Sequence, residues 1–369
     1  MRTTALMAAA ILVLTGWEGN MAFGQAQGKF VVVPVKNPEY RANQIFLAYE
    51  DFYSPRMAEL RSKYGIDAAV AGKTDEWERI LALEHWIKEK VAGGHATPPG
   101  RDAFAILDAA QTGSRFDCGP VSTVEHAVMN SHGYVTRRLG AGPGLKTNGG
   151  HHGVTEVWVN KFGKWVVMDA EYELHFEKDG VPLSALEIRD EIWKDGGKSV
   201  VRCFGPERRP TADEYREIYG PTTETYRWVS WEASTNHFTA YPAPTTSTMV
   251  MFEDNFFRNN VWYRDGKPHW AYNTPYLIKC PNRSWIEWTP NVISAKVQVN
   301  DQKAVVTLTS FTPNFRSFQM KTDDGTWADC GEQVALPLAR QTNAFTFRTV
   351  NLFGVTGPEH RVQIDWQKA

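Results

Sequence analysis

Residues 117–133 read DCGPVSTVEHAVMNSHG, a polar turn followed by an apolar run with helical spacing. Val121, Val124 and Val128 fall on one helical face and the closing glycine is a stop signal, so the stretch predicts a helix that begins near Cys118. A cysteine at a helix N-terminus lies beside unpaired backbone N–H groups and the positive end of the helix dipole. This position favours the thiolate, which is the nucleophilic form of the side chain.

Two strand-like segments follow this helix, and each carries one polar residue that could serve the cysteine. His152 lies in the segment 149–159, Asp169 ends the segment 163–169, and the residues between the segments indicate a tight hairpin. Such a hairpin places the histidine beside the aspartate. The pattern predicts a Cys–His–Asp relay, in which the imidazole takes the thiol proton and the carboxylate fixes the imidazole tautomer and stabilises its charged form.

The three motifs resemble those of the transglutaminase-like superfamily of papain-type cysteine enzymes. That family has a Cys that opens a helix, a His followed four residues later by Glu-Val on a strand, and then a Gly-x-Trp-x-x-x-Asp strand. Here these read as Cys118, His152 with Glu156-Val157, and Gly163-Lys164-Trp165 leading to Asp169. The resemblance covers roughly residues 75–175. It implies that Cys118, His152 and Asp169 are catalytic and that the fold is α+β, with helices packed on an antiparallel sheet.

His151 and Glu156 are neighbours of the predicted triad in the sequence. Side chains alternate along a strand, so only one of His151 and His152 can face Cys118, and the family spacing to Glu156 selects His152. Glu156 lies an even number of positions from His152. It is therefore predicted either to contact the site from the same side or to lie on a solvated surface.

The length of 369 residues is sufficient for two domains. We expect a signal peptide over residues 1–26, a transglutaminase-like catalytic domain over 27–250, a connecting β-rich segment over 251–285 and an all-β sandwich over 286–369. Helical spacing in the catalytic domain is clearest over four stretches: 43–64, 75–88, 102–110 and 184–193. The last segment holds six candidate strands with intervening turn signals, a spacing that suits an immunoglobulin-like or fibronectin-like module.

The N-terminal segment has the pattern of a secretory signal. Arg2 gives a positive start, an apolar core follows over 5–14, and Gly24-Gln25-Ala26 offers small residues at the cleavage positions. We therefore expect a secreted or periplasmic protein with no membrane span after signal cleavage. An uncleaved membrane anchor is the minor alternative, because the apolar core is short for a span.

The amino-acid composition bears on which classes of partner the protein can bind. A formal net charge of −2 argues against nucleic acid as the main partner. Fourteen tryptophans raise the prospect of a glycan contact through a Trp-rich surface, although core packing is the commoner explanation. The glycine-rich loop at 140–150 is not predicted to bind phosphate, because it lacks a glycine before Lys146 and leads into a strand. We expect no cofactor.

Four cysteines are present. If any pair forms a disulfide in an oxidising compartment, we expect Cys280 with Cys330, which leaves Cys203 buried. A Cys118–Cys203 disulfide is the alternative that would remove the nucleophile.

The leading hypothesis is a secreted cysteine enzyme that transfers acyl groups from amide or peptide bonds through a thioester. Its expected partner is a protein or peptide substrate, with cell-wall peptide as one candidate. Hydrolysis is favoured over amine crosslinking, because exported members of bacterial type in the superfamily look more like hydrolases. The alternative is a catalytically idle glycan- or protein-binding module. A third hypothesis is a metal hydrolase built on Glu171, Glu173 and His175, which alternate along the chain and could share a face.

Overall fold

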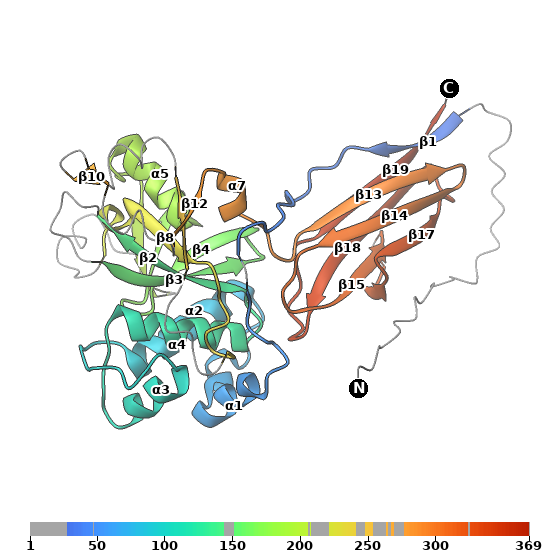
Figure 1. The fold of residues 1–369 in the computed structure, drawn as a ribbon. Helices are drawn as coiled ribbons and strands as arrows, with labels where there is room; N and C mark the ends of the chain where they lie inside the picture. The colour runs from blue at the N-terminus through green and yellow to red at the C-terminus, as the bar shows by residue number, and fades with distance from the viewer. Residues whose placement is uncertain are drawn as a thin grey trace, which may run out of the picture. The chain divides into compact units, whose positions relative to one another are not determined.

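The computed structural model describes residues 28–46, 48–143, 151–205, 207, 221–240, 248–253, 263–264, 267–268, 277–323 and 325–368. The expected signal peptide, most of the glycine-rich loop and much of the segment 251–285 lie outside these residues. The chain divides into two compact units: residues 43–288 form the larger, and residues 289–368 together with 28–42 form the smaller. Figure 1 shows the elements of each.

The larger unit contains a six-stranded sheet. Its strands are β2 (Thr136–Gly142), β3 (His152–Val159), β4 (Lys164–Met168), β8 (Trp228–Glu232), β9 (Met249–Phe252) and β12 (Leu277–Cys280). They are ordered β12-β9-β8-β2-β3-β4, and all neighbours are antiparallel except β12 and β9. A smaller antiparallel sheet is ordered β6-β5-β7, from β5 (Leu174–Lys178), β6 (Val181–Pro182) and β7 (Val201–Phe204). A two-residue pair joins β10 (Tyr263–Arg264) to β11 (Lys267–Pro268).

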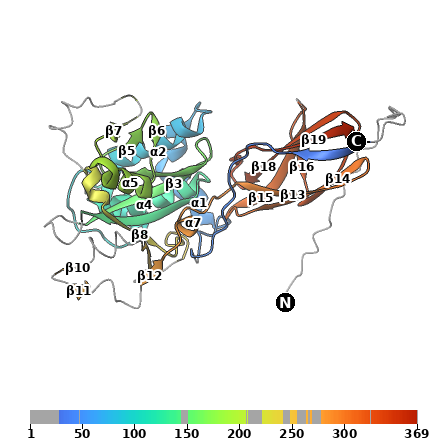
Figure 2. The ribbon, with the colours of Figure 1, turned by 90° about the horizontal axis from the view of Figure 1, so that it is seen from above.

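Helices lie on both sides of the six-stranded sheet. They are α1 (Pro55–Tyr64), α2 (Glu76–Val91), α3 (Ala103–Gln111), α4 (Cys118–Ser131), α5 (Ala185–Asp195) and α7 (Arg283–Ile286), with short 3-10 turns η1 (Ile66–Val70) and η3 (Thr223–Tyr226). Figure 1 shows α1 to α4 together on one side and α5 on the other, and Figure 2 gives the view from above. The α4 helix packs against β2 and β3. The expected α+β class is confirmed.

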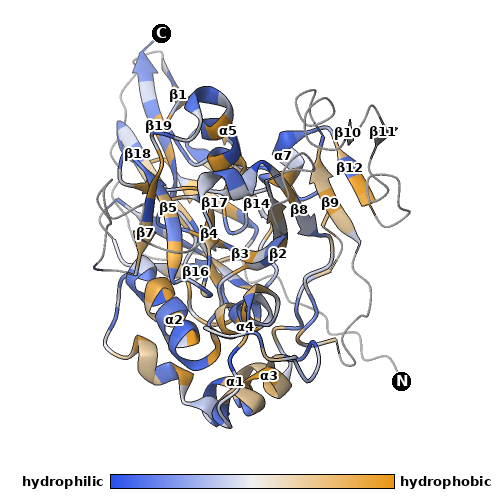
Figure 3. Cartoon of the chain, turned by 90° about the vertical axis from the view of Figure 1, so that its left-hand side faces the viewer, coloured by the Kyte–Doolittle hydropathy of each residue, from blue (hydrophilic) through white to orange (hydrophobic). Residues whose placement is uncertain are grey.

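Besides the helix that begins at Cys118, three of the four expected helical stretches form close to their predicted bounds, and the fourth is shorter. In α2 the Asp75 carboxylate accepts hydrogen bonds from the backbone N–H groups of Trp77 and Glu78 and so caps the helix. Figure 3 shows hydrophilic and hydrophobic residues alternating along α2, as expected of an amphipathic helix. The helix expected over 43–64 begins only at Pro55, after the Ser54 cap. Proline lacks an N–H and its ring clashes with a preceding turn, so it fits the first turn and not the interior.

The smaller unit is a β-sandwich of two antiparallel sheets. Its strands are β1 (Gly28–Val33), β13 (Ile293–Asn300), β14 (Lys303–Ser310), β15 (Phe315–Thr322), β16 (Ala328–Cys330), β17 (Gln333–Pro337), β18 (Thr342–Asn351) and β19 (His360–Lys368). One sheet is ordered β1-β19-β18-β15-β16 and the other β13-β14-β17. Side chains from both sheets, among them Phe347, Ile364 and Val306, form one buried cluster. All six expected strands are present; β16 was missed because three residues show no periodicity.

The N-terminal strand β1 belongs to this sandwich. It pairs antiparallel with β19 from Gly28 opposite Lys368 to Val33 opposite Gln363. Residues 28–42 therefore join the sandwich unit and not the catalytic domain expected over 27–250. The strand itself follows from its apolar residues, but a pairing partner more than 300 residues away leaves no local signal.

No helix in the described parts of the chain combines the length and the apolar character that a membrane crossing requires.

Replacing Phe30 tests the place of β1 in the sandwich. Phe30 is 6% exposed and its ring meets that of Trp366 edge-on at 5.0 Å, so Phe30→Ala should lower the free energy of unfolding of the sandwich by about 3–5 kcal/mol. The matched control is Val32→Ala on the exposed face of the same strand, which should cost only about 0.5 kcal/mol. Denaturant unfolding measures both. Equal effects of the two substitutions would contradict the assignment of β1.

Candidate active site

Cys118 is the first residue of α4, as the sequence predicts. Asp117 is extended with φ −89° and ψ −168°, and its carbonyl accepts the N–H of Val121 at 3.2 Å. The thiol is therefore held beside the first turn, where N–H groups without intrahelical partners favour negative charge. Cys118 is partly buried. Because Gly153 of β3 approaches Gly119 and Ser122, the start of α4 lies beside the start of β3.

His152 is the first residue of β3, and Asp169 directly follows β4. The two strands form the predicted antiparallel hairpin, with Thr155 opposite Met168. His152 Nε2 lies 2.7 Å from Asp169 Oδ2, and Asp169 is only 1% exposed. A buried carboxylate thus orients the imidazole and leaves Nδ1 as the ring nitrogen that can face Cys118.

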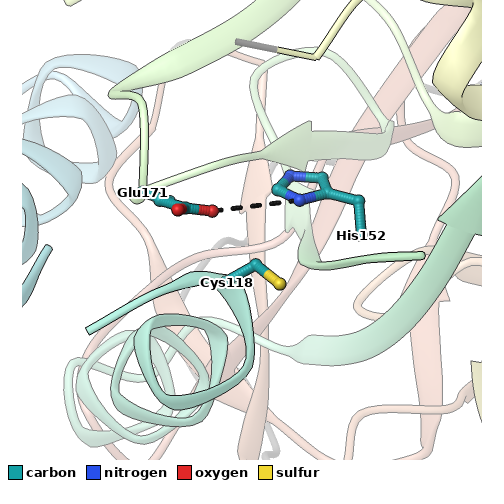
Figure 4. Close-up of side chains that lie close together, drawn as sticks. All are labelled: Cys118, His152 and Glu171. Carbon is teal, nitrogen blue, oxygen red and sulfur yellow. Dashed lines mark ion pairs between the residues drawn. The ribbon is translucent and has the colours of Figure 1, made fainter. Parts of the chain in front are cut away.

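The three predicted residues are brought together. Cys118 Sγ lies within 4.8 Å of a ligating nitrogen of His152, and Figure 4 shows the sulfur at the helix start below the imidazole. His152 is the histidine at the site, as the family spacing to Glu156 implies, whereas the neighbouring His151 is exposed and its ring lies 5.7 Å from that of Trp228. The grouping of Cys118, His152 and Asp169 that the sequence predicts is therefore present in the structure.

Electrostatics at this site favour a charged imidazole. Burial alone would lower the pKa of His152, but the Asp169 carboxylate, helped by Cys118, raises that pKa to about 11. An imidazolium held in this way stabilises a thiolate at Cys118, since opposite charges in close contact each favour the other.

Glu171 is a further acid at this site. Its Oε2 lies 3.9 Å from His152 Nδ1, and its side chain is 13% exposed. Burial and the nearby charge of Asp169 raise the pKa of Glu171 to about 7, against the opposing effect of His152. A role for Glu171 beside the triad is not predictable from the sequence, because the residue follows β4 in a turn where no periodicity indicates a direction.

Two fully buried acids behind Asp169 were missed. Glu84 of α2 accepts the backbone N–H of Asp169 at 3.1 Å and is 0% exposed. Burial and the charges of Asp169 and Glu173 raise the pKa of Glu84 well above its usual range. Burial, Glu84 and Asp169 raise the pKa of Glu125 in the same way. Asp169 is thus the acid whose charge a neighbouring cation balances.

Spacing could have revealed both acids. Glu84 lies four residues after Ile80 and three before Ile87, within the apolar stripe of α2. Glu125 likewise lies four residues after Val121 and three before Val128 in α4. A charged residue at an apolar-face position is rarely buried without a function or a partner.

Glu156 lies in the protein core, so its expected alternative as solvated surface was wrong. Its carboxylate accepts hydrogen bonds from the Arg137 guanidinium at 2.8 Å, from Trp231 Nε1 at 2.7 Å and from the Ala185 backbone N–H at 2.8 Å. Glu156 is 0% exposed. These partners belong to β2, β8 and α5, so the residue ties the sheet to α5 and is not a direct partner of the cysteine.

The alternative metal set of Glu171, Glu173 and His175 is not brought together. Glu173 Oε1 lies 2.9 Å from His85 Nδ1, whereas His175 Nε2 lies 3.0 Å from Glu177 Oε1. Glu173 has a positive φ of 54°, which breaks the strand alternation on which the expectation depended. The third residue, Glu171, faces His152 instead.

No disulfide bond joins any of the four cysteines, all of which lie in described segments. The expected Cys280–Cys330 pair is therefore not formed, and Cys280 and Cys330 belong to different units. The alternative pair of Cys118 with Cys203 is not formed either.

Tryptophans contribute strongly to the core. Trp158, Trp165, Trp231 and Trp288 are fully buried, and the exposed large apolar side chains in the described residues include no tryptophan. Core packing thus accounts for these four, and a glycan contact stays a prediction.

The buried acid behind Asp169 gives a test by pH. The pKa of Glu84 is higher in the folded protein than in the unfolded chain. The contribution of this group to the free energy of unfolding is therefore fully present below about pH 4.3 and decreases as the pH rises. Glu84→Gln removes the ionisable group and keeps an acceptor for the Asp169 N–H. Its unfolding free energy should therefore rise relative to wild type by up to about 1.4 kcal/mol for each pH unit above about 4.3.

Denaturant unfolding from about pH 5 to about pH 8 measures this difference. The matched control is Glu89→Gln on the exposed face of the same helix, for which no such slope is expected. A difference between Glu84→Gln and wild type that does not change with pH would contradict a neutral buried Glu84.

Comparison with protein-family models gives no match, and comparison with curated proteins gives none either. The chemistry of the site is therefore inferred from its geometry.

Proposed function

We propose that this protein is a secreted, cysteine-dependent acyl-transfer enzyme of the transglutaminase-like type. It acts on amide or peptide bonds through a thioester, with hydrolysis favoured over amine crosslinking. The observation that carries the proposal is the Cys118 thiol at the start of α4, close to an imidazole whose other nitrogen is held 2.7 Å from the buried Asp169 carboxylate.

The chemistry follows from the roles of these groups. The Cys118 thiolate attacks the carbonyl carbon, and the backbone N–H at the start of α4 stabilises the negative oxygen that develops. The His152 imidazolium gives its Nδ1 proton to the leaving amine as the C–N bond breaks, which leaves a thioester on Cys118. A water then loses a proton to His152 and attacks the thioester, so that the C–S bond breaks and the acid is released. An amine in place of the water gives a crosslink.

The order of elements supports the family assignment. A cysteine-opened helix packs against a strand that begins with the histidine, and that strand forms a hairpin with the one that leads to the aspartate. This is the order that the resemblance implies. The segment 1–26 supports export by its signal-like pattern. The proposed substrate is a protein or peptide, and cell-wall peptide is one candidate.

Acylation by an activated ester tests the function without knowledge of the natural substrate. Incubation with p-nitrophenyl acetate should place an acetyl group on Cys118, detected by peptide mass spectrometry, with continued release of nitrophenolate as the thioester is hydrolysed. His152→Ala should slow acetylation of Cys118 by about 100-fold or more, because the base that activates the thiol is lost. The matched control His151→Ala should stay within about threefold of wild type, the range of a surface change.

Acetylation of Cys118 that is equally fast in His152→Ala and His151→Ala would contradict the proposal. So would release of nitrophenolate by the Cys118→Ser variant at the wild-type rate.

Selective alkylation tests the role of the imidazolium. Because the pKa of His152 is about 11, the imidazolium persists through neutral pH. At neutral pH iodoacetamide should therefore modify Cys118 at least about tenfold faster in wild type than in His152→Ala, because the neighbouring positive charge that favours the nucleophilic form is lost. Burial raises the pKa of Cys330 to about 12 and also raises that of Cys280, so these thiols should react slowly. Mass spectrometry of timed samples measures each site, and equal Cys118 rates in wild type and His152→Ala would be the contrary result.

A further inference from the structure

Three side chains at the candidate site each offer one ligand atom to a metal ion. Cys118 Sγ, a nitrogen of His152 and a carboxylate oxygen of Glu171 all lie within 4.8 Å of one another. They come from three different elements: the start of α4, the start of β3 and the turn after β4. Figure 4 shows the sulfur, the ring and the carboxylate converging on one space, with the Glu171 carboxylate directed at the imidazole.

The chemistry of this set selects zinc. Thiolate, imidazole and carboxylate are the three ligand types that Zn²⁺ takes in proteins, and three of them with an open fourth position is the usual arrangement at an exchangeable site. With bonds of about 2.0–2.3 Å, a tetrahedral ion holds neighbouring ligand atoms about 3.3–3.6 Å apart. The Nδ1–Oε2 distance of 3.9 Å therefore needs to shorten only by a fraction of an ångström.

The Asp169 carboxylate orients the histidine ring for a metal, which must displace the Nδ1 proton. His152 Nε2 is engaged with the Asp169 carboxylate at 2.7 Å, so Nδ1 is the nitrogen that would ligate. Zinc-bound histidines almost always give their other ring N–H to a carboxylate or carbonyl in this manner, which fixes the ring and makes it a stronger ligand. The acids Asp169 and Asp117 add negative charge near Glu171, and the cations His152 and Lys88 act against them.

The site also has an approach from solvent. The side chains of His152 and Glu171 are 12% and 13% exposed, and Cys118 is partly buried. A second group with similar spacing, formed by His175, Glu177 and Cys203, is buried at all three residues. The group at the candidate site is therefore the one that an ion can enter and leave without unfolding of the surrounding sheet.

We propose that Cys118, His152 and Glu171 form a reversible Zn²⁺ site whose occupancy blocks the Cys118 thiol. Binding releases the Nδ1 proton of the His152 imidazolium, together with the Cys118 thiol proton and the Glu171 carboxyl proton where these are present, and forms Zn–N, Zn–S and Zn–O bonds; no redox change is involved. Ion binding rests only on the three ligands, whereas inhibition of an enzymatic activity rests on the proposed function. Zinc availability would then set how much of the protein carries a reactive thiol.

Protection from alkylation tests the site. At neutral pH, ZnCl₂ should slow iodoacetamide modification of Cys118, and EDTA should restore the original rate. Glu171→Gln should still be alkylated without zinc, but should need at least about tenfold more zinc for half-protection, because a charged ligand is lost. The matched control is Glu173→Gln, two residues along the chain and paired with His85, which should be protected like wild type.

Cobalt gives a readout that does not depend on reactivity of the thiol. Co²⁺ should produce a thiolate-to-metal absorption band in wild type and in Cys330→Ser, and Cys118→Ser should abolish it. A band that survives in Cys118→Ser and disappears in Cys203→Ser would place the ion in the buried group and overturn the proposal. So would zinc protection that is the same in Glu171→Gln and Glu173→Gln.

The outcomes separate this inference from the proposed function. Acetylation of Cys118 that zinc does not slow would refute the metal site and leave the acyl-transfer chemistry intact. A Co²⁺ band lost only in Cys118→Ser, in a protein that shows no acetylation of Cys118, would support the metal site and refute the enzyme.

Discussion

A buried carboxylate in contact with an imidazole constrains the larger unit. Asp169 is almost completely removed from water, and an ionised carboxylate in such a place needs a cation in contact with it. His152 supplies that cation at 2.7 Å. The positive charge of the imidazole in turn favours a negative charge on the sulfur at the start of α4. Removing either partner leaves a buried charge without compensation, which costs more than the pair itself contributes.

A second buried ion pair keeps the strands that carry these groups in register. Arg137 Nη2 lies 2.7 Å from Glu156 Oε2. The central carbon of the Arg137 guanidinium lies 4.1 Å from the centre of the Trp165 ring. Trp231 also donates to Glu156, so β2, β3, β4 and β8 meet at one point. Glu156 lies four residues after His152 on the same strand, so this ion pair anchors β3 to its neighbours close to the residue that contacts Asp169.

The sequence predicted the parts of this unit that depend on local pattern. The helix that starts at Cys118 follows from apolar spacing and a glycine stop, and the hairpin that joins His152 to Asp169 follows from its turn signal; both are observed. The choice of His152 over His151 follows from the family spacing to Glu156, and His152 is the histidine that contacts Asp169. The role of Glu156 could not be predicted, because a buried acid and a surface acid look alike in one sequence. Its partners Trp231 and Ala185 lie far along the chain.

The features that were not predicted divide into those without a sequence signal and those whose signal was overlooked. The partner of β1 is the last strand of the chain, so its place in the sandwich depends on a contact with no sequence signal. Glu84 and Glu125 did carry a signal, since each interrupts an apolar helical stripe. Glu171 lies in a turn, and only the fold shows that it faces the imidazole.

A pH titration of the His152 ring by NMR is the most direct measurement of the central interaction. We expect the imidazole to stay protonated through neutral pH, with a pKa of about 11, because the buried Asp169 carboxylate lies 2.7 Å from Nε2. Asp169→Asn should bring that pKa down toward the ordinary value of about 6.5, whereas His151→Ala should leave it unchanged. If His152 titrates near the ordinary value in the wild-type protein, or if Asp169→Asn titrates like wild type, His152 and Asp169 are not the charged pair on which this account depends.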